Sequence, residues 1–445
     1  MTKSASSTDR LSAARSRLRS LYESDSRPWV VAYSGGKDST AVLQLVYELL
    51  LEEKQAGKAS KPVFVISSDT RVEAPNVAAY VSETLGRIAT GAKLAELPMT
   101  VELVTPKAVE GFWAKLIGLG YPSPTRWFRW CTTSMKIKPS RRAIEQISQT
   151  HGSVILLLGT RVDESVLRGI AINARETNAR GLNPHNEIPN ALVATPIVDW
   201  TTDDVWDYLY SNDPPWGGDH SFMLSLYRQA NGGECPLVLD LNTPSCGGSR
   251  FGCWTCTVVK EDKSMQGFIQ SGEEWMQPLN DFRDWLKEIR EDPTRRNPLR
   301  RDGKSAGPGP FNAITRQEIL ECLLKAEKTV GQSLISDEEI IVIQDIWTRE
   351  FDYSDTALKL AGAYGRELAM DKSNTRRSEE DQLLDECARD TEFSAELAHE
   401  LFEVVRKKHA MLDRWGAKEE LRRDLRSLIE RDINQALAAD PAHDL

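Results

Sequence analysis

The stretch Trp29-Val-Val-Ala-Tyr-Ser-Gly-Gly-Lys-Asp-Ser-Thr40 places a glycine-rich hexapeptide directly between an apolar strand and a helix. Glycine lets the backbone approach a phosphate closely, and the free N–H groups and positive dipole at the start of a helix attract an anion. The spacing differs from the Walker loop, which has four residues between its first glycine and Gly-Lys-Ser/Thr. We therefore predict a different pyrophosphate cradle, formed by Ser34, Gly35, Gly36, Lys37, Asp38 and Ser39.

Further short apolar runs alternate with helical stretches on both sides of this loop. Strands that alternate with helices predict an α/β fold with a doubly wound parallel sheet, whose ligand crevice lies at the carboxyl ends of the strands. The expected helices are Leu11–Tyr22, Thr40–Lys54 and Val77–Leu85. The expected strands are Trp29–Tyr33, Val63–Ser67, Val101–Val104, Val154–Gly159 and one around Ile197.

The length of 445 residues predicts more than one domain. We expect a nucleotide-binding domain over 1–210 and a cysteine-rich region over 211–270, built mostly of loops because Asn, Asp, Pro and Gly dominate it. A helical, partly basic region over 271–377 and a charged helical tail over 378–445 follow. The composition, 40% apolar and 27% charged, is typical of a soluble globular protein.

The location and surface charge also follow from composition. The sequence has no apolar run of roughly 20 residues that would span a membrane, and residues 1–10 lack the apolar core of a secretory signal, so we expect a cytoplasmic protein. The net charge of −10 excludes a uniformly basic surface. Two local basic segments, Arg126–Arg142 and Arg295–Lys304, are candidates for DNA contact, or else pair with neighbouring acids.

Four of the seven cysteines, Cys235, Cys246, Cys253 and Cys256, fall within 22 residues. Such crowding without an export signal favours metal or sulfur chemistry over disulfides. Four thiolates on a glycine-rich loop suit either zinc or an iron–sulfur cluster, and the spacing does not separate the two. The scarcity of histidine favours iron–sulfur.

A fifth cysteine, Cys131, stands in Arg126-Trp-Phe-Arg-Trp-Cys-Thr-Thr-Ser-Met-Lys-Ile-Lys-Pro139, where cations and aromatic rings alternate. This interleaving suits a flipped or single nucleotide, with arginines on phosphate and rings on the base. Neighbouring cations would favour the thiolate of Cys131, the form that carries sulfane sulfur. The alternative is a buried, inert cysteine beside a solvated basic helix.

The hexapeptide resembles the PP-loop of the ATP pyrophosphatases, which cleave ATP between the α and β phosphates. Within that group, the segments after the second strand and after the Val154–Gly159 strand look most like the phosphoadenylylsulfate reductases. This resemblance implies that Asp69 and Thr70 contact the nucleoside and that Arg161 and Arg168 contact the phosphates. Polar caps and surface ion pairs are the alternative for these four residues.

Taken together in their order, the loop, the Cys131 segment and Phe251-Gly-Cys-Trp-Thr-Cys-Thr-Val-Val259 resemble the DNA phosphorothioation sulfurtransferases of the Dnd system. The resemblance implies a 4Fe-4S cluster on Cys235, Cys246, Cys253 and Cys256, a cysteine desulfurase as sulfur donor, and other Dnd proteins as partners. ATP, with Mg²⁺, would adenylate a non-bridging phosphate oxygen of DNA, which sulfur then replaces. A related system that modifies single strands has a similar subunit.

Lys37 would neutralise charge that develops in the transition state. Replacing Lys37 or Asp38 by alanine is expected to remove turnover without unfolding the chain.

Three other functions remain open. A phosphoadenylylsulfate reductase needs a mobile C-terminal cysteine, and no cysteine follows Cys387 here. An iron–sulfur tRNA thiolase would use the same activation but would have to recognise folded RNA. A non-catalytic nucleotide or DNA sensor would tolerate decay of the loop, whereas Gly35, Gly36, Lys37 and Asp38 are all present.

Overall fold

The computed structural model describes residues 7–164, 181–185, 187–230, 252–301, 305–350, 352, 355–368, 401, 404–405 and 422–430. The chain divides into two compact units. The first, called the sheet unit, comprises Met1–Phe112 and Pro124–Asp284. The second, called the helical unit, comprises Trp113–Ser123 and Trp285–Leu445.

The sheet unit contains a six-stranded sheet of order β3-β2-β1-β4-β6-β5. Every neighbouring pair is parallel except β5 with β6. This confirms the predicted α/β fold with a parallel sheet. The strands are β1 (Trp29–Tyr33), β2 (Val63–Ser68), β3 (Met99–Val104), β4 (Val154–Leu157), β5 (Asn183–Pro184) and β6 (Ala191–Ala194).

The fifth expected strand, around Ile197, is wrong in position. The strand is β6, which ends at Ala194, and Ile197 lies buried in the turn that follows. Pro196 explains the difference, because proline has no N–H to donate to a sheet ladder. The short antiparallel strand β5 had no signal in the sequence, and its Pro184 is tolerated there because β5 lies at the edge of the sheet.

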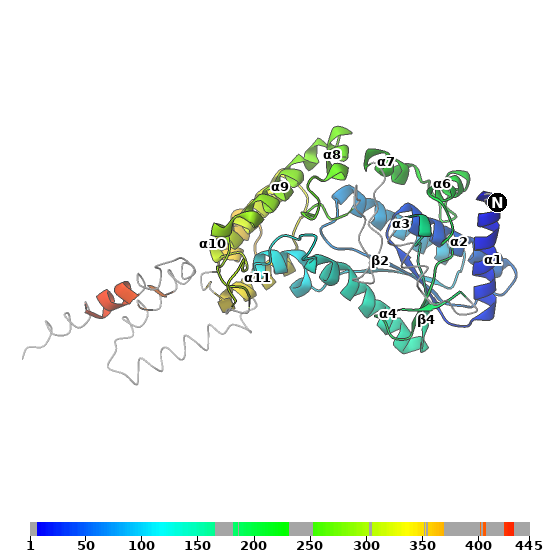
Figure 1. Cartoon of the computed structure of the whole chain (residues 1–445), viewed down its shortest axis with the longest axis horizontal. Helices are drawn as coiled ribbons and strands as arrows, with labels where there is room; N and C mark the ends of the chain where they lie inside the picture. Colours follow the sequence, from blue (N-terminus) through cyan, green and yellow to red (C-terminus); the bar gives the residue numbers. More distant parts are fainter. Residues whose placement is uncertain are drawn as a thin grey trace, which may run out of the picture. The chain divides into compact units, whose positions relative to one another are not determined.

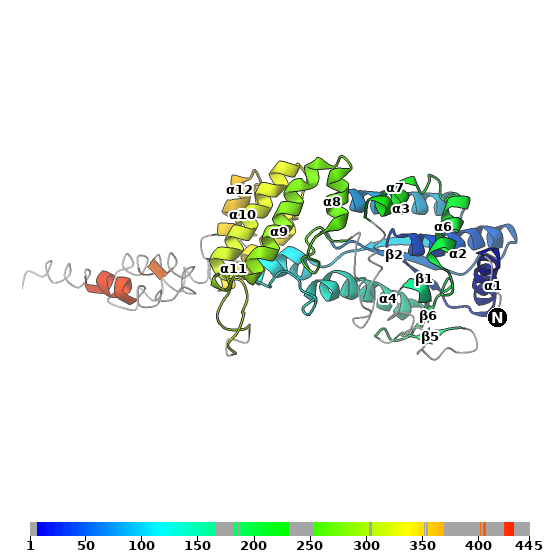
Figure 2. The same ribbon diagram turned by 45° about the horizontal axis from the view of Figure 1, so that its top comes forward.

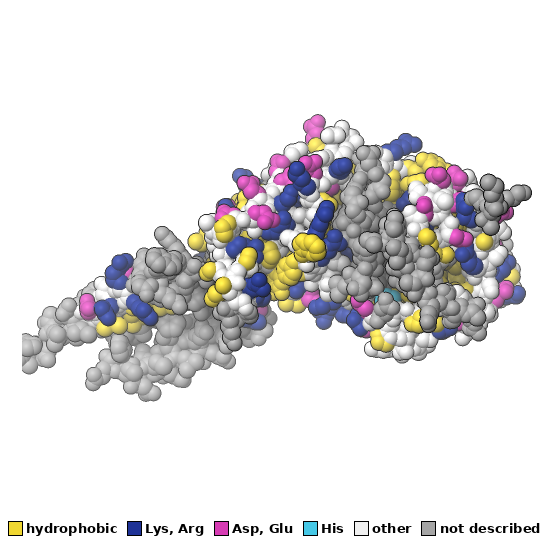
Figure 3. Space-filling model, viewed as in Figure 1, with side chains coloured by type: hydrophobic (Ala, Val, Ile, Leu, Met, Phe, Trp, Pro, Cys, Tyr) yellow, Lys and Arg dark blue, Asp and Glu magenta, His cyan; other side chains and the backbone are white. Residues whose placement is uncertain are grey.

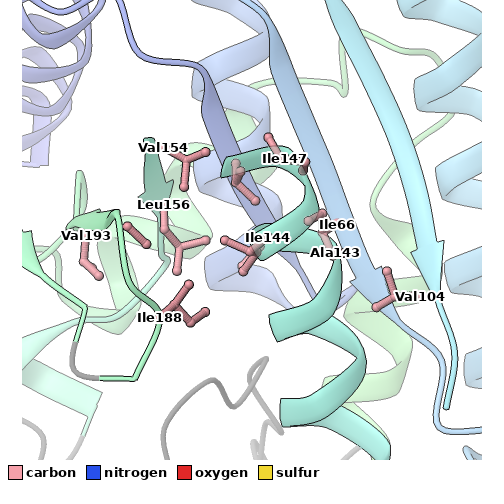
Figure 4. Packing of buried hydrophobic residues seen from close by; sticks show 12 residues of the cluster. Ile66, Val104, Ala143, Ile144, Ile147, Val154, Leu156, Ile188 and Val193 are labelled. Atoms are coloured by element: carbon pink, nitrogen blue, oxygen red, sulfur yellow. The ribbon is translucent and has the colours of Figure 1, made fainter. Parts of the chain in front are cut away.

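Helices cover both faces of the sheet. Alternate side chains of β1 point to opposite faces, and Val30 and Ala32 pack in one core cluster with Ile144 and Ile147 of α4 (Lys138–His151). Figure 4 shows these α4 side chains directed at the strands. In Figure 2, α2 and α3 lie on the side of the sheet opposite α4. The bounds of these two helices are Lys37–Gln55 and Pro75–Leu94.

The remaining helices of the sheet unit are α1 (Ser7–Ser24), α6 (Thr202–Ser211), α7 (Ser221–Ala230) and α8 (Lys263–Gln270). The expectation that the cysteine-rich region is built mostly of loops did not anticipate helix α7. Its Met223, Leu226 and Tyr227 are buried at helical spacing. The glycine and proline residues on either side concealed that short periodicity.

The helical unit is built around α10 (Ala313–Val330) and α11 (Asp337–Glu350) (Figure 1), with α12 (Thr356–Ala363) beside α10 (Figure 2). The boundary between the units falls within α9 (Gln277–Glu291). Residues 113–123, from the first half of the chain, belong to this unit: Trp113 Nε1 donates to Leu334 O at 2.7 Å, and Trp347 Nε1 donates to Ile117 O at 3.0 Å. No helix among the described residues is long and apolar enough to cross a membrane.

Candidate functional site

The glycine-rich loop lies where the sequence predicts it, between β1 and α2. Ser34 N donates to Ser39 Oγ at 3.2 Å, and Ser39 Oγ donates to Gly36 O at 2.9 Å, so the loop closes on itself. Gly35 has φ of +77°, and a Cβ there would stand 2.6 Å from Val81 Cγ2. Only glycine meets both conditions, because other residues rarely adopt that backbone conformation.

Lys37 and Asp38 are both buried at the start of α2. Lys37 Nζ donates to Asp38 Oδ2 at 2.9 Å, and Arg161 Nε donates to Asp38 Oδ1. The Arg161 side chain is only 1% exposed, and its Nη1 also reaches Trp200 O at 3.3 Å. Arg161 therefore lies beside the glycine-rich loop, and its guanidinium contacts Asp38 directly. A contact between Arg161 and phosphate stays a prediction.

Two residues beside the loop were not predicted from the sequence as site residues. A Cβ on Gly159, which follows β4, would stand 2.8 Å from the backbone carbonyl of Asp38, so this glycine allows the close approach. Tyr227 of α7 accepts a hydrogen bond from Lys37 N at 3.2 Å, and Lys37 Nζ lies 5.2 Å from its ring centroid. The sequence signal for Tyr227 is the spacing of apolar residues in α7.

The segment after β2 leads to a second part of the site. Asp69 Oδ1 accepts from Arg71 N at 2.7 Å, which fixes a turn. Thr70 is fully buried, and its Oγ1 lies 3.4 Å from Cys253 Sγ. Glu73 and Cys253 form an antiparallel bridge. The predicted contact of Asp69 and Thr70 with a nucleoside stays a prediction, and the structure adds the contact of Thr70 with a thiol.

Three cysteines line one cavity of about 70 Å³, which we call the thiol pocket. Cys131 contributes from the cation–aromatic segment, and Cys253 and Cys256 contribute from the Cys-x-x-Cys turn. The three are free thiols. The lining also includes Thr70, Phe112, Arg129, Met135, Lys136 and Val259. Two sequence motifs more than a hundred residues apart therefore meet at one place.

A buried arginine holds the backbone of the turn. Arg283 is fully buried; its Nε donates to Cys256 O at 2.9 Å, its Nη1 donates to Lys260 O at 3.1 Å, and its Nη2 donates to Val259 O. One planar guanidinium thus satisfies the carbonyl of Cys256 and two carbonyls shortly after it. The other side of the turn is fixed by Thr257 Oγ1, which donates to Pro124 O at 2.8 Å.

The expected thiolate of Cys131 is wrong for this environment. Burial raises the pKa of the Cys131 thiol to about 12, and Lys136 opposes that rise only weakly. Burial likewise raises the pKa of Cys253. The surrounding protein thus favours the neutral thiol at both positions, because desolvation outweighs the nearby cation.

Three predicted site residues, Arg168, Cys235 and Cys246, lie outside the described residues. Among the residues that are described, no group of three or more His, Cys, Asp or Glu side chains is arranged to hold a metal ion. Cys253 and Cys256 lie within one turn, in which Cys256 N donates to Cys253 O at 3.0 Å.

Much of the expected basic surface is engaged in ion pairs. Lys138 and Arg142 both pair with Glu110, and Arg141 pairs with Glu145. In the helical unit, Arg295 pairs with Glu318. These four cations therefore pair with acids of the chain itself, and their contact with DNA stays a prediction. Figure 3 shows Lys and Arg side chains interspersed with acidic ones on the described surface facing the viewer.

Two further arginines of the second basic segment contact their own unit. Arg296 Nε donates to Gly309 O at 2.6 Å, and Arg301 Nη1 donates to Leu119 O at 2.9 Å. The Arg301 guanidinium also lies 4.9 Å from the ring centroid of Tyr121. These contacts fix backbone within the helical unit.

The chain is similar to several known proteins. An uncharacterized protein of Methanocaldococcus jannaschii is 25% identical over 268 residues, which are 60% of this chain and 44% of that protein. The chain therefore spans less than half the length of this curated relative.

Two solved structures are also similar. Phosphoadenylyl-sulfate reductase of Candida auris, in its phosphate complex, has 15% identity and a TM-score of 0.30, with 50% of this chain and 94% of that chain covered. The U34-tRNA thiolase NcsA of Methanococcus maripaludis, with its 4Fe-4S cluster, has 9% identity and a TM-score of 0.29, with 63% and 80% covered.

The family model of the phosphoadenosine phosphosulfate reductase domain matches residues 28–259, from the start of the first sheet strand to just beyond the Cys-x-x-Cys turn. This range includes the glycine-rich loop and all three thiols of the pocket. The chain belongs to the phosphoadenosine phosphosulfate reductase domain family.

Proposed function

We propose that this chain is an ATP-dependent sulfurtransferase that places sulfur in the phosphate backbone of DNA. The observation that carries the proposal is that the phosphate loop and the thiol pocket share one edge of the sheet. The loop follows β1, Thr70 of the pocket follows β2, and Tyr33 pairs in register with Ser67. Carboxyl ends of parallel strands meet at the same edge, so a nucleotide and a sulfur donor would be brought together there.

The chemistry begins with ATP. A non-bridging oxygen of the DNA phosphate attacks the α-phosphorus of ATP, the bond between the α-phosphorus and the bridging oxygen breaks, and pyrophosphate leaves. The backbone N–H groups of Gly35 to Ser39 and the Lys37 ammonium would stabilise the charge that develops on that pyrophosphate. Mg²⁺ would enter as the counter-ion of ATP. The terminal sulfur of a Cys131 persulfide then attacks the activated DNA phosphorus, and AMP leaves with the original oxygen. A thiol reductant then attacks the Cys131 sulfur and breaks the S–S bond, so that the outer sulfur stays on the phosphorus and a mixed disulfide forms on Cys131.

Cys131 would receive the sulfur. It lies in the same pocket as Cys253 and Cys256, and its neighbours Arg129 and Lys136 carry positive charge suited to an anionic substrate. Because the raised pKa of Cys131 favours the neutral thiol, transfer of sulfur from a donor must supply the reactive form. The proposal includes a cysteine desulfurase as the donor, other Dnd-system proteins as partners, and a cytoplasmic location.

Two of the four expected cluster ligands, Cys253 and Cys256, lie among the described residues. They fit a 4Fe-4S cluster, since both are soft thiol donors in one turn held by Arg283. Cys253 and Cys256 would hold it together with Cys235 and Cys246. Such a cluster supplies iron sites that bind sulfide or exchange electrons. Protein purified without oxygen should contain about four irons per chain, and Cys253→Ser or Cys256→Ser should remove them. Cys322→Ser, which changes a free thiol on α10, is the matched control.

The proposal is tested by the product in cells. Nuclease digests of DNA from cells that carry the complete system should contain phosphorothioate-linked dinucleotides, detected by mass spectrometry, and Cys131→Ser should eliminate them. Thiolated bases in tRNA with unmodified DNA would instead establish a tRNA thiolase. Sulfite formed from phosphoadenylylsulfate would establish a reductase.

A further inference from the structure

A tryptophan stands almost fully in solvent beside the thiol pocket. The Trp127 side chain is 97% exposed, and its neighbour Phe128 is 44% exposed. Trp130, three residues on, is by contrast buried and stacks on Phe112 at a centroid distance of 5.2 Å. The aromatic residues of this segment therefore have different roles. Trp130 belongs to the core, whereas Trp127 contributes nothing to it.

Local hydrogen bonds hold Trp127 in its exposed position. Thr125 Oγ1 accepts hydrogen bonds from Trp127 N at 3.3 Å and from Phe128 N at 3.0 Å, and Thr125 N donates to Phe128 O at 3.2 Å. We call residues Thr125–Arg129 the Trp127 loop. These three bonds fix its backbone as a tight turn, with Trp127 at its outer end.

Both ends of the Trp127 loop lead into the thiol pocket. Arg129 and the preceding Pro124 line the pocket, and Pro124 O accepts the hydrogen bond from Thr257 just after Cys256. A ligand that rests on Trp127 would thus extend toward Cys131. The loop therefore lies next to the place where sulfur would be transferred.

The charges around the loop point to an anionic ligand. Arg126 is exposed, and no ion pair within 4.0 Å is found for it among the described residues, whereas Lys138, Arg141 and Arg142 are each paired with a glutamate. The patch of one indole and one phenyl ring is too small for a stable protein interface, which buries about 800 Å² on each partner. An isolated ring next to an arginine is instead typical of sites that stack a base and bind its phosphate.

We propose that the Trp127 loop is the docking platform for an unpaired nucleotide of the DNA strand, whose base stacks on Trp127 while Arg126 contacts the adjacent phosphate. The base must be unpaired because both faces of a base inside a duplex are already covered by its neighbours. The platform would hold the strand so that the next phosphate reaches the thiol pocket. This inference rests on the proposed function, because it takes DNA as the substrate.

The test is the affinity for a fluorescein-labelled single-stranded DNA of about 16 nucleotides, measured by anisotropy with the full-length chain. Trp127→Ala should weaken binding by about tenfold or more, as loss of one stacked base does. Trp127→Phe keeps a ring and should retain most of the affinity. Leu94→Ala, which removes another exposed apolar side chain (80% exposed), is the matched control and should bind as the unmodified chain does.

Three further measurements identify the class of ligand. A 2-aminopurine base in the strand should be quenched by the unmodified chain and much less by Trp127→Ala, because stacking on the indole causes the quenching. The same sequence as a duplex should bind with little dependence on Trp127. Equal affinity of Trp127→Ala and the unmodified chain for the single strand would overturn the proposal, as would dependence on Trp127 for tRNA alone. The binding result is independent of the ATP products, so failure of the proposed chemistry would be seen separately.

Discussion

Replacement of Asp38 should destabilise the sheet unit, and not only remove activity. The Asp38 carboxylate is 5% exposed and lies between Lys37 and Arg161, of which Arg161 is 1% exposed. Asp38→Ala would leave two buried cations without their shared counter-charge. Breaking a buried ion pair from one side costs about 3–5 kcal/mol. The expectation from the sequence, loss of turnover without unfolding, is therefore replaced by a stability effect at Asp38.

The matched variants separate charge from shape. Asp38→Asn keeps the size of the side chain but removes its charge, so it should be destabilised nearly as much as Asp38→Ala. Asp38→Ala combined with Arg161→Met removes the most deeply buried cation as well and should be more stable than Asp38→Ala alone. Lys37→Ala should stay folded, because Asp38 keeps Arg161 as its partner.

Hydrogen exchange of the β1 amides is the appropriate assay, because the chain has two compact units and need not unfold in one step. A loss of 3 kcal/mol would speed exchange of those amides by about a hundredfold. Exchange in Asp38→Ala within about twofold of the unmodified chain, or a double variant as unstable as the sum of the two single ones, would refute the assignment of Asp38 as the counter-charge of Arg161.

Three more predictions concern single residues. Gly35→Ala should lose more stability than Gly57→Ala, because both have positive φ (+77° and +70°) but only Gly35 would place its Cβ against Val81; equal losses by hydrogen exchange would contradict the clash. Arg283→Met should lower the iron content per chain more than Arg283→Lys does, and unchanged iron in both would show that the carbonyl contacts do not position the cysteines. Burial lowers the pKa of Lys61 from 10.5 to about 8. Between these two pH values the unfolded chain binds one more proton than the folded chain, so the free energy of unfolding should rise as the pH rises from about 8 to 10.5. A Lys61→Met variant with the same pH profile would contradict this.

The local features of the fold could be predicted from the sequence because their signals lie within a few residues. The glycine-rich loop, the apolar run of β1 and the helix after the loop each depend on neighbouring residues. The strand near Ile197 was misplaced because apolar content was weighed above Pro196, whose missing N–H ends the pairing. Helix α7 was missed because only three buried residues indicate it.

The contacts that build the site were beyond prediction because they join distant segments. Thr70 and Cys253 are 183 positions apart, and Asp38 and Arg161 are 123 apart. Which polar residues meet at a sheet edge depends on strand order, which periodicity does not encode. The thiolate of Cys131 was predicted wrongly for a related reason: the sequence displays the nearby cations but not the burial that outweighs them.

The products of ATP provide the most direct test of the central claim that the loop Ser34–Ser39 supports cleavage between the α and β phosphates. Chain incubated with ATP, Mg²⁺, DNA and the sulfur donor should release AMP and pyrophosphate in equal amounts, separated by ion-exchange chromatography. Lys37→Ala should abolish both products while β1 amide exchange stays as in the unmodified chain. ADP and inorganic phosphate as the main products, or undiminished turnover in Lys37→Ala, would contradict the account.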